Sequence, residues 1–205
     1  MANRYVFQCV FSCILLFASC EDRGVESITD KRSIETGTLS ASRDGMTVRI
    51  KTEYERVVDV ALHEVGEKEY ETNWSPRIKQ YLAVCNIKTP AYWCGAFTSF
   101  VQDSCMLPYP DGCAWTPNWF NPKRVYWRKG NDMSKARIGT NVGFYFASKK
   151  RIAHIGILYK IDEDSGVYQT IEGNATANSA SRNGDGVYIK IRQPWEIHQM
   201  SDWTK

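Results

Sequence analysis

The sequence predicts an α+β protein in which N-terminal helices pack against an antiparallel β-sheet. Two observations carry this prediction. Between residues 53 and 105, apolar side chains recur at intervals of three and four, which is typical of helices with one buried face. From residue 142 onwards the interval changes to two, in short β-branched and aromatic runs with short connections. Helices followed by closely spaced strands favour segregated layers, with the helices on one side of the sheet.

Two helices are expected before residue 90. The first runs from Glu53 to Val65, and Thr52 and Glu55 have the spacing of a capping box at its start. The second follows Ser75, a residue type that caps helix N-termini, and its apolar stripe reaches Cys85. Both patterns are amphipathic, so each helix is expected to bury one face.

A third helix is expected to begin at or near Cys94. Pro90 stands just before it, where a helix cannot yet have started. After the cysteine, Phe97, Phe100 and Val101 recur at offsets of three and four, as on one helical face. The cysteine therefore lies at a helix N-terminus in this interpretation.

The segment 107–120 is rich in Pro and Gly and is expected to be a loop, after which Asn121-Pro122 can begin one more short helix that ends at Gly130. Strands are expected beyond residue 140. The last of them alternates apolar side chains on one face with Tyr188, Lys190 and Arg192 on the other. The expected strands are 142–147, 153–161, 167–172 and 187–192.

The N-terminus has the features of an export signal. Arg4 precedes the apolar run Val6 to Ala18, which is too short to span a membrane. Small residues precede Cys20, as at a bacterial lipoprotein cleavage site, although Phe17 stands where Leu is usual. We expect residues 1–20 to be a lipoprotein-type signal peptide and Cys20 to carry a lipid anchor. A plain secretory signal cleaved nearby is the alternative.

Both interpretations place the protein outside the cytoplasm, the first as a periplasmic or outer-membrane lipoprotein held on a membrane face. Residues 21–50 are polar and without period, which indicates a tether, and residues 51–205 form the expected domain.

The formal net charge of +3 is too small to indicate a nucleic-acid partner. Hydrophobic residues make up 43% of the chain, as in globular proteins.

Because an exported protein can form disulfides, the sequence raises the question of which cysteines pair. Of the seven, those at positions 9, 13 and 20 belong to the signal, and Cys85, Cys94, Cys105 and Cys113 remain. If Cys94 stays reduced, Cys105 and Cys113 are the expected pair, because they flank a short stretch rich in Pro, Gly and Asp. The acidic run Asp162-Glu163-Asp164 does not follow a calcium-loop pattern, so no metal or cofactor is expected.

Cys94 is the candidate nucleophile. The unpaired N–H groups and the dipole at a helix N-terminus favour an anion, and the thiolate is the reactive form of cysteine. The alternative is that Cys94 is a small buried hydrophobic residue, as most reduced cysteines are.

A base and an orienting group are available later in the chain. Of the three histidines, His63 is expected on the polar face of the first helix and His198 in the C-terminal tail. His154 lies near the start of an expected strand, beside a turn, where it can reach a cleft. Glu172 and Asn174 end another strand, and either can fix the tautomer of an imidazole. A buried structural histidine and a polar strand end are the alternatives.

Three short blocks therefore occur in the order cysteine, histidine, acid. They are Trp93-Cys94-Gly95-Ala96-Phe97, His154-Ile155-Gly156-Ile157 and Ile171-Glu172-Gly173-Asn174. Together they resemble the CHAP family, which comprises cysteine amidohydrolases and peptidases of the papain-like NlpC/P60 superfamily. The resemblance covers about Glu53 to Arg192 and implies the papain-like NlpC/P60 fold.

The resemblance also implies roles. Cys94 would be the nucleophile, His154 the general base and then acid, and Glu172 the orienting group. Asn174 would align the histidine or bind the developing oxyanion, and the Cys94 backbone N–H would be an oxyanion donor. The implied substrate is an amide bond of peptidoglycan, cleaved through a thioester intermediate. Two departures, Ala153 where the family often has Gly and Gly139-Thr140-Asn141 where it often has Pro-Gly-Asp, concern the shape of the cleft.

Two function classes remain open. The first is an exported peptidoglycan amidase or endopeptidase. The second is a non-catalytic lipoprotein that holds peptidoglycan or a protein partner in the same cleft. Trp93, Trp115 and Trp119 are candidates for substrate contact, with packing as the alternative.

Overall fold

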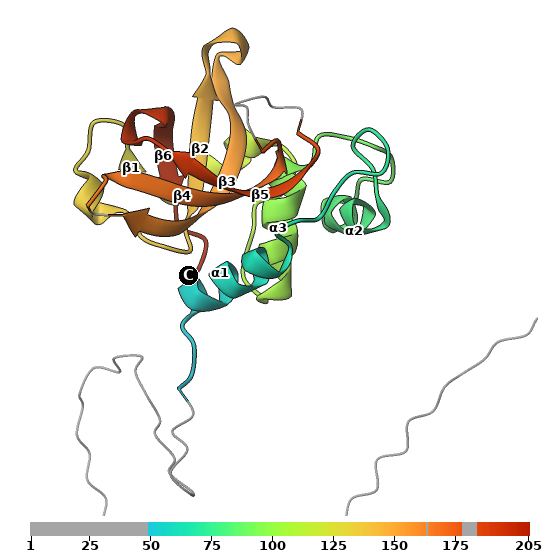
Figure 1. The fold of residues 1–205 in the computed structure, drawn as a ribbon, viewed down its shortest axis with the longest axis horizontal. Helices are drawn as coiled ribbons and strands as arrows, with labels where there is room; N and C mark the ends of the chain where they lie inside the picture. Colours follow the sequence, from blue (N-terminus) through green and yellow to red (C-terminus); the bar gives the residue numbers. More distant parts are fainter. Residues whose placement is uncertain (1–48, 163, 178–183) are drawn as a thin grey trace, which may run out of the picture. The chain divides into compact units, whose positions relative to one another are not determined.

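Three α-helices precede a six-stranded antiparallel β-sheet in the computed structural model, which describes residues 49–162, 164–177 and 184–205 (Figure 1). The predicted α+β architecture is therefore confirmed. The predicted signal peptide, its Cys20 and all but the last residues of the tether lie outside the described residues. Within the described part, no helix is long and apolar enough to span a membrane.

The helices start where the capping residues predict. α1 (Glu53–His63) begins at the capping box of Thr52 and Glu55 and ends two residues earlier than expected. α2 (Pro76–Val84) is capped by the Ser75 side chain, which accepts a hydrogen bond from the Ile78 N–H. α3 (Cys94–Ser104) begins at the cysteine itself.

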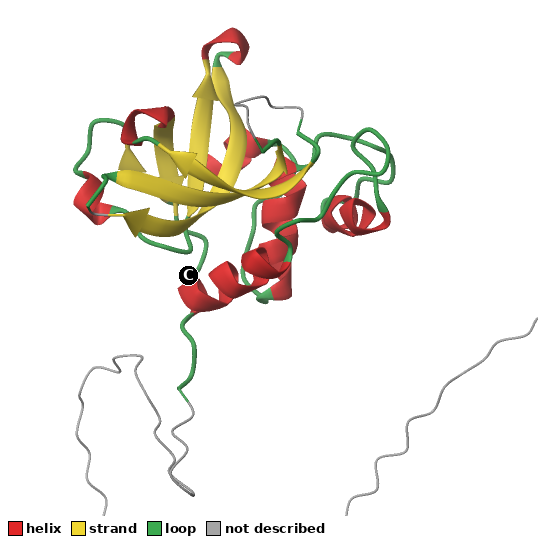
Figure 2. Ribbon diagram, viewed as in Figure 1, coloured by secondary structure: helices red, strands yellow, loops and turns green. Residues whose placement is uncertain are grey.

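The sheet contains every expected strand. Its order is β1-β6-β2-β3-β4-β5, and every neighbouring pair is antiparallel. Figure 2 shows the strands in yellow and the helices in red. The strands are β1 (Val125–Arg128), β2 (Asn141–Phe146), β3 (Arg151–Asp162), β4 (Val167–Ala175), β5 (Gly186–Arg192) and β6 (Ile197–Ser201). Short 3-10 segments, η1 (Thr116–Phe120), η2 (Met133–Lys135), η3 (Ala147–Lys149) and η4 (Pro194–Glu196), lie between them.

Two strands correct the sequence-based expectation. The helix expected over 121–130 is wrong, because residues 125–128 form β1 instead. The segment expected to be a C-terminal tail contains β6, which lies between β1 and β2 and pairs with both. Tertiary pairing decides the outcome here, since β1 gains its hydrogen-bonding partner from a segment far away in the sequence.

The helices lie on one side of the sheet and enclose the first core. α3 packs on β3 and β4, α1 packs on α3 and β3, and α2 packs on α3 (Figure 1). Close approach of α3 to β4 requires Gly173, because a Cβ atom there would lie 2.6 Å from the Cβ of Phe97. Fully buried members of this core include Val57, Tyr81, Leu82, Trp93, Phe97, Ile157, Ile171 and Val187.

A second cluster is built around Val142, Leu158 and Met200 and includes side chains from β1 and β6. Along β5 the side chains alternate as expected, but from Ile189 onwards the polar positions are the buried ones. Lys190 and Arg192 are each 8% exposed, whereas Ile191 is 66% exposed. The two cations therefore lie inward, on the face of the sheet where Arg192 contacts Glu172 of β4.

Candidate active site

Cys94 lies at the first position of α3, with its side chain buried. The N-cap residue, Trp93, forms no side-chain hydrogen bond to the first turn. The dipole at the start of this helix favours an anion beside the cysteine sulfur. The backbone of residues 113 and 114 packs against the same turn, where a Cβ atom on Gly95 would lie 2.6 Å from the Cys113 carbonyl oxygen.

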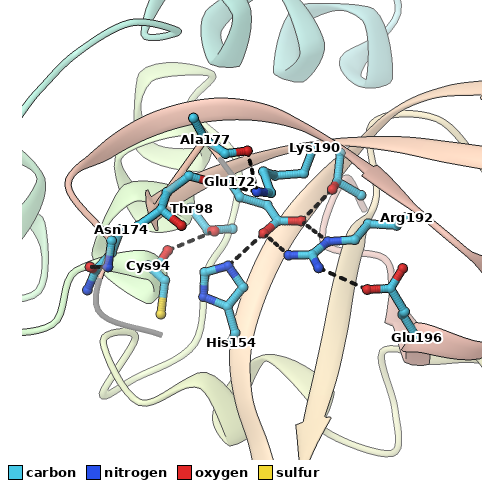
Figure 3. A network of polar contacts seen from close by, with 12 residues as sticks. Cys94, Thr98, His154, Glu172, Asn174, Ala177, Lys190, Arg192 and Glu196 are labelled. Carbon is cyan, nitrogen blue, oxygen red and sulfur yellow. Dashed lines mark hydrogen bonds and ion pairs between the residues drawn. The ribbon is translucent and has the colours of Figure 1, made fainter. Parts of the chain in front are cut away.

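His154 lies on β3, near the hairpin that joins β2 to β3, opposite Phe144 in the register. Its ring is 3% exposed and lies 5.7 Å from the Phe144 ring. Nε2 is 2.8 Å from Oε2 of Glu172. The other ring nitrogen, Nδ1, is buried, and the side of the ring that carries it faces the Cys94 sulfur (Figure 3). The histidine therefore lies between a thiol and a carboxylate.

Glu172 is fully buried on β4 and is held at both oxygens. Oε2 accepts hydrogen bonds from His154 and from Nη2 of Arg192, the latter at 2.6 Å. Oε1 accepts from Nε of Arg192 at 2.8 Å and from the Thr170 hydroxyl at 2.5 Å. With four hydrogen bonds and no exposed surface, the carboxylate has one orientation, which points at His154 (Figure 3).

These contacts determine the pKa values of His154 and Glu172. Burial alone would lower the pKa of His154, but the interactions with Cys94 and Glu172 raise it to about 9. Burial alone would raise the pKa of Glu172, but the hydrogen bonds and charges of Arg192 and His154 lower it to about 2. At neutral pH the site thus holds an imidazolium beside a carboxylate, with the sulfur on the other side of the ring.

Asn174 is separated from Glu172 by a β-bulge. The register between β4 and β5 shifts between Glu172 and Ala175, and Asn174 has a positive φ of 52°. Its Oδ1 accepts a hydrogen bond from the Gly184 N–H at 3.0 Å, while its buried Nδ2 has no hydrogen-bond partner among the described residues. Figure 3 shows the side chain on the Cys94 side of the site. Glu172 occupies Nε2 of His154, so Asn174 does not align the ring.

The three tryptophan candidates differ in exposure. Trp93 and Trp119 are fully buried, and their N–H groups bond to Glu69 and to the Cys113 carbonyl, so neither reaches a ligand in this structure. For both residues the packing alternative applies. Trp115 is 51% exposed, and the Arg151 guanidinium lies 3.9 Å from its ring centre. Of the three tryptophans, only Trp115 is exposed enough to contact a substrate.

The disulfide joins Cys85 to Cys113, with 5.8 Å between their Cα atoms. The expected Cys105–Cys113 pair is wrong, and Cys105 stays reduced and buried. Cys105 follows the last residue of α3, whereas Cys113 packs against the first turn of that helix. Because α3 has 11 residues, its two ends are about 16 Å apart. This distance exceeds what a disulfide can bridge.

Sequence reasoning missed Arg192 as a member of the site. The alternation along β5 put Arg192 on the polar face, but which face turns inward depends on how β5 pairs with β4. In the structure Tyr188 lies opposite Glu172 and Arg192 lies opposite Tyr168, so the Arg192 guanidinium reaches the carboxylate along the strand direction. Without that register, no signal in the sequence separates Arg192 from an exposed arginine.

Two hollows lie near these residues. One, of about 240 Å³, is lined by His154 and Arg192 together with Glu196 and the aromatic residues 144–146. A larger one, of about 590 Å³, lies between the Pro-rich loop and Trp203 and is lined by neither Cys94 nor His154. Within the described ranges, no three His, Cys, Asp or Glu side chains are grouped to hold a metal ion.

Comparisons with models of protein families, with curated proteins and with solved structures return no match to this chain. The class of the protein therefore follows from its own geometry. It is an α+β protein with a buried cysteine–histidine–glutamate cluster at the start of a helix.

Proposed function

We propose that this protein is an exported cysteine hydrolase that cleaves an amide bond of peptidoglycan. The single observation that carries the chemistry is His154, held between the Cys94 sulfur and an ionised Glu172. The CHAP-like blocks around these residues supply the substrate class, together with the papain-like NlpC/P60 fold as the proposed finer description of the α+β architecture.

The geometry supports the first half of an acyl transfer. The Cys94 thiolate attacks the carbonyl carbon of the amide and forms a tetrahedral intermediate. His154, as the imidazolium, gives its proton to the leaving amine, and the carbon–nitrogen bond breaks. The acyl group is then a thioester on Cys94, and His154 is neutral. Glu172 keeps the ring oriented throughout, because its carboxylate holds Nε2.

The same groups support the second half. The neutral His154 takes a proton from a water molecule that attacks the thioester carbon, and the thiolate leaves as the acid product is released. In both halves the oxyanion is bound by the backbone N–H of Cys94. Nδ2 of Asn174 is a second donor, because it is buried on the cysteine side and its Oδ1 is already anchored.

The proposed location outside the cytoplasm has independent support. The Cys85–Cys113 disulfide is typical of oxidising compartments. Together with the signal-like N-terminus, it supports an exported protein with a lipid anchor at Cys20. Peptidoglycan is the polymer that such a protein meets there.

The experiment that tests the proposal is digestion of purified peptidoglycan by the full chain, with mass spectrometry of the released fragments. We expect products that identify one cleaved amide bond, and losses of at least about 1,000-fold in Cys94→Ala and His154→Ala. Cys105→Ala is the matched control, because it removes the other reduced thiol among the described residues and is expected to retain activity.

Iodoacetamide provides a readout that needs no substrate. We expect rapid alkylation of Cys94 that slows in His154→Ala, and slow alkylation of Cys105, whose thiol pKa is raised by burial. Tight binding to peptidoglycan without any cleavage, combined with an unreactive Cys94, would establish the non-catalytic lipoprotein instead.

A further inference from the structure

Arg192 makes more contacts with Glu172 than the catalytic histidine does. Its Nε and Nη2 atoms bind the two carboxylate oxygens at 2.8 and 2.6 Å, which is a bidentate pair. Its Nη1 atom donates to Glu196 at 3.1 Å, and its guanidinium lies 4.4 Å from the centre of the Phe144 ring. The arginine is thus fixed on three sides (Figure 3).

Among the residues that the structure describes, the charged groups around His154 can be named. Cys94 of α3 and Glu172 of β4 act on the ring directly, and Arg192 of β5 pairs with Glu172. From β2, the uncharged Phe144 lies beside the ring. Two further charged groups act through Arg192 and Glu172. They are Lys190, whose Nζ donates to the carbonyl oxygens of Thr176 and Ala177, and Glu196.

A lone carboxylate in this position would impede the proposed reaction. His154 has to exist as imidazolium when it protonates the leaving amine and as neutral imidazole when it activates water. A buried glutamate without a counter-ion would bind the proton of the imidazolium so tightly that the second step would be slow. The guanidinium offsets the charge of Glu172 and still leaves Oε2 to orient the ring.

We propose that Arg192 is a positioning residue of the candidate site, which holds the Glu172 carboxylate against His154 and offsets its charge so that the histidine can release its proton. This inference rests on the proposed cysteine-hydrolase function. It adds a fourth charged group to the cysteine, histidine and glutamate, and it assigns to the inward face of β5 a role in the chemistry.

The test is a titration of the histidine rings by NMR in the full chain, in a Cys94→Ala background so that the sulfur does not titrate with the ring. With three histidines in the sequence, His63 and His198 act as internal references. We expect Arg192→Met to raise the pKa of His154 by at least about one unit, because the Glu172 charge is no longer offset. Arg192→Lys keeps the charge but loses the bidentate geometry, so it is expected to raise the pKa of His154 less than Arg192→Met does.

Arg77→Met is the matched control. Arg77 also forms a bidentate pair with a buried glutamate, Glu64, but between α1 and α2. The Arg77→Met substitution removes a comparable ion pair and is expected to leave the His154 titration unchanged. A pKa of His154 that is unchanged or lower in Arg192→Met would overturn the proposal. If Arg192→Met unfolds the chain, the pKa of His154 is compared between Arg192→Lys and Arg192→Gln instead.

A second readout uses catalysis. With Cys94 restored, we expect Arg192→Met to lower kcat on peptidoglycan at least tenfold at pH 7 and to move the acidic limb of its pH profile upwards. Arg192→Lys should recover most of the rate. If no variant, including the parent, cleaves peptidoglycan, the proposed function fails, but the titration still decides whether Arg192 controls the proton on His154.

Discussion

At the scale of single residues, the proposed chemistry depends on a chain of contacts that runs from sulfur to guanidinium. Cys94, His154, Glu172 and Arg192 come from α3, β3, β4 and β5, one residue from each element. Each neighbour controls the next: the carboxylate orients the ring, and the ring faces the thiol. The first three residues were predictable because their types match the steps of acyl transfer, whereas Arg192 has no step of its own.

The pKa shifts of His154 and Glu172 predict how stability depends on pH. The pKa of Glu172 is lowered from 4.5 to about 2, so its contribution is present above pH 4.5 and is lost as the pH falls towards 2. The pKa of His154 is raised from 6.5 to about 9, so its contribution is present below pH 6.5 and is lost as the pH rises towards 9. Each loss is expected to be on the order of 3 kcal/mol of unfolding free energy.

Urea denaturation at a series of pH values measures this dependence. His154→Gln is the comparison protein, and the decline between pH 6.5 and 9 should be much smaller in it. The pKa of His198 is lowered by burial, so below pH 6.5 this residue makes the unfolding free energy rise with pH. This contribution is the same in both proteins. An equal alkaline decline in the two proteins would contradict the assignment of the shift to His154.

At the scale of elements, the site depends on how closely α3 approaches its neighbours. Glycine provides this approach on two sides: Gly173 faces Phe97 and Trp93, and Gly95 faces the carbonyl groups of residues 113 and 114. A side chain at position 173 would push the first turn of α3 away from β4, which carries Glu172, and a side chain at position 95 would push it away from the loop at residues 113 and 114. Packing of the helix and geometry of the site are therefore coupled.

Gly173→Ala tests this coupling. The added Cβ atom would lie 2.6 Å from two Phe97 atoms and 2.8 Å from the Trp93 ring, so the helix has to shift. We expect a loss of about 1–3 kcal/mol in unfolding free energy and slower alkylation of Cys94 by iodoacetamide. Gly130→Ala is the control: at its φ of 95° a side chain is strained but meets nothing within 4 Å, so stability falls while alkylation keeps its rate. Wild-type stability and alkylation in Gly173→Ala would refute the coupling.

The disulfide ties the end of α2 to the loop that packs on the first turn of α3. It spans 28 residues, for which the loop-entropy relation gives about 3–4 kcal/mol. We expect Cys85→Ser and Cys113→Ser each to lower the unfolding free energy by roughly this amount, and Cys105→Ser to cost less. Non-reducing peptide mapping should recover the Cys85–Cys113 peptide, and recovery of a Cys105–Cys113 peptide would contradict the pairing.

At the scale of the whole molecule, the proposed anchor and the domain can be tested separately. Metabolic labelling with an alkyne fatty acid in a bacterial host should label the full chain, because Cys20 follows a signal-like segment. Cys20→Ala should lose the label, and Cys13→Ala should keep it. An unlabelled wild-type protein that is cleaved and released would indicate the plain secretory signal.

The sequence alone determined the order of the three helices and of four of the six strands, the start of α3 at Cys94 and the residue types of the cluster. These features depend on local periodicity, capping and side-chain chemistry, which neighbouring residues report directly. Only the tertiary structure decided the pairing of β1 with β6, the Cys85–Cys113 bridge, the burial of Trp93 and Trp119 and the contact of Arg192 with Glu172. Each of these depends on which distant segments become neighbours when the sheet forms, and local patterns in the chain carry no record of that.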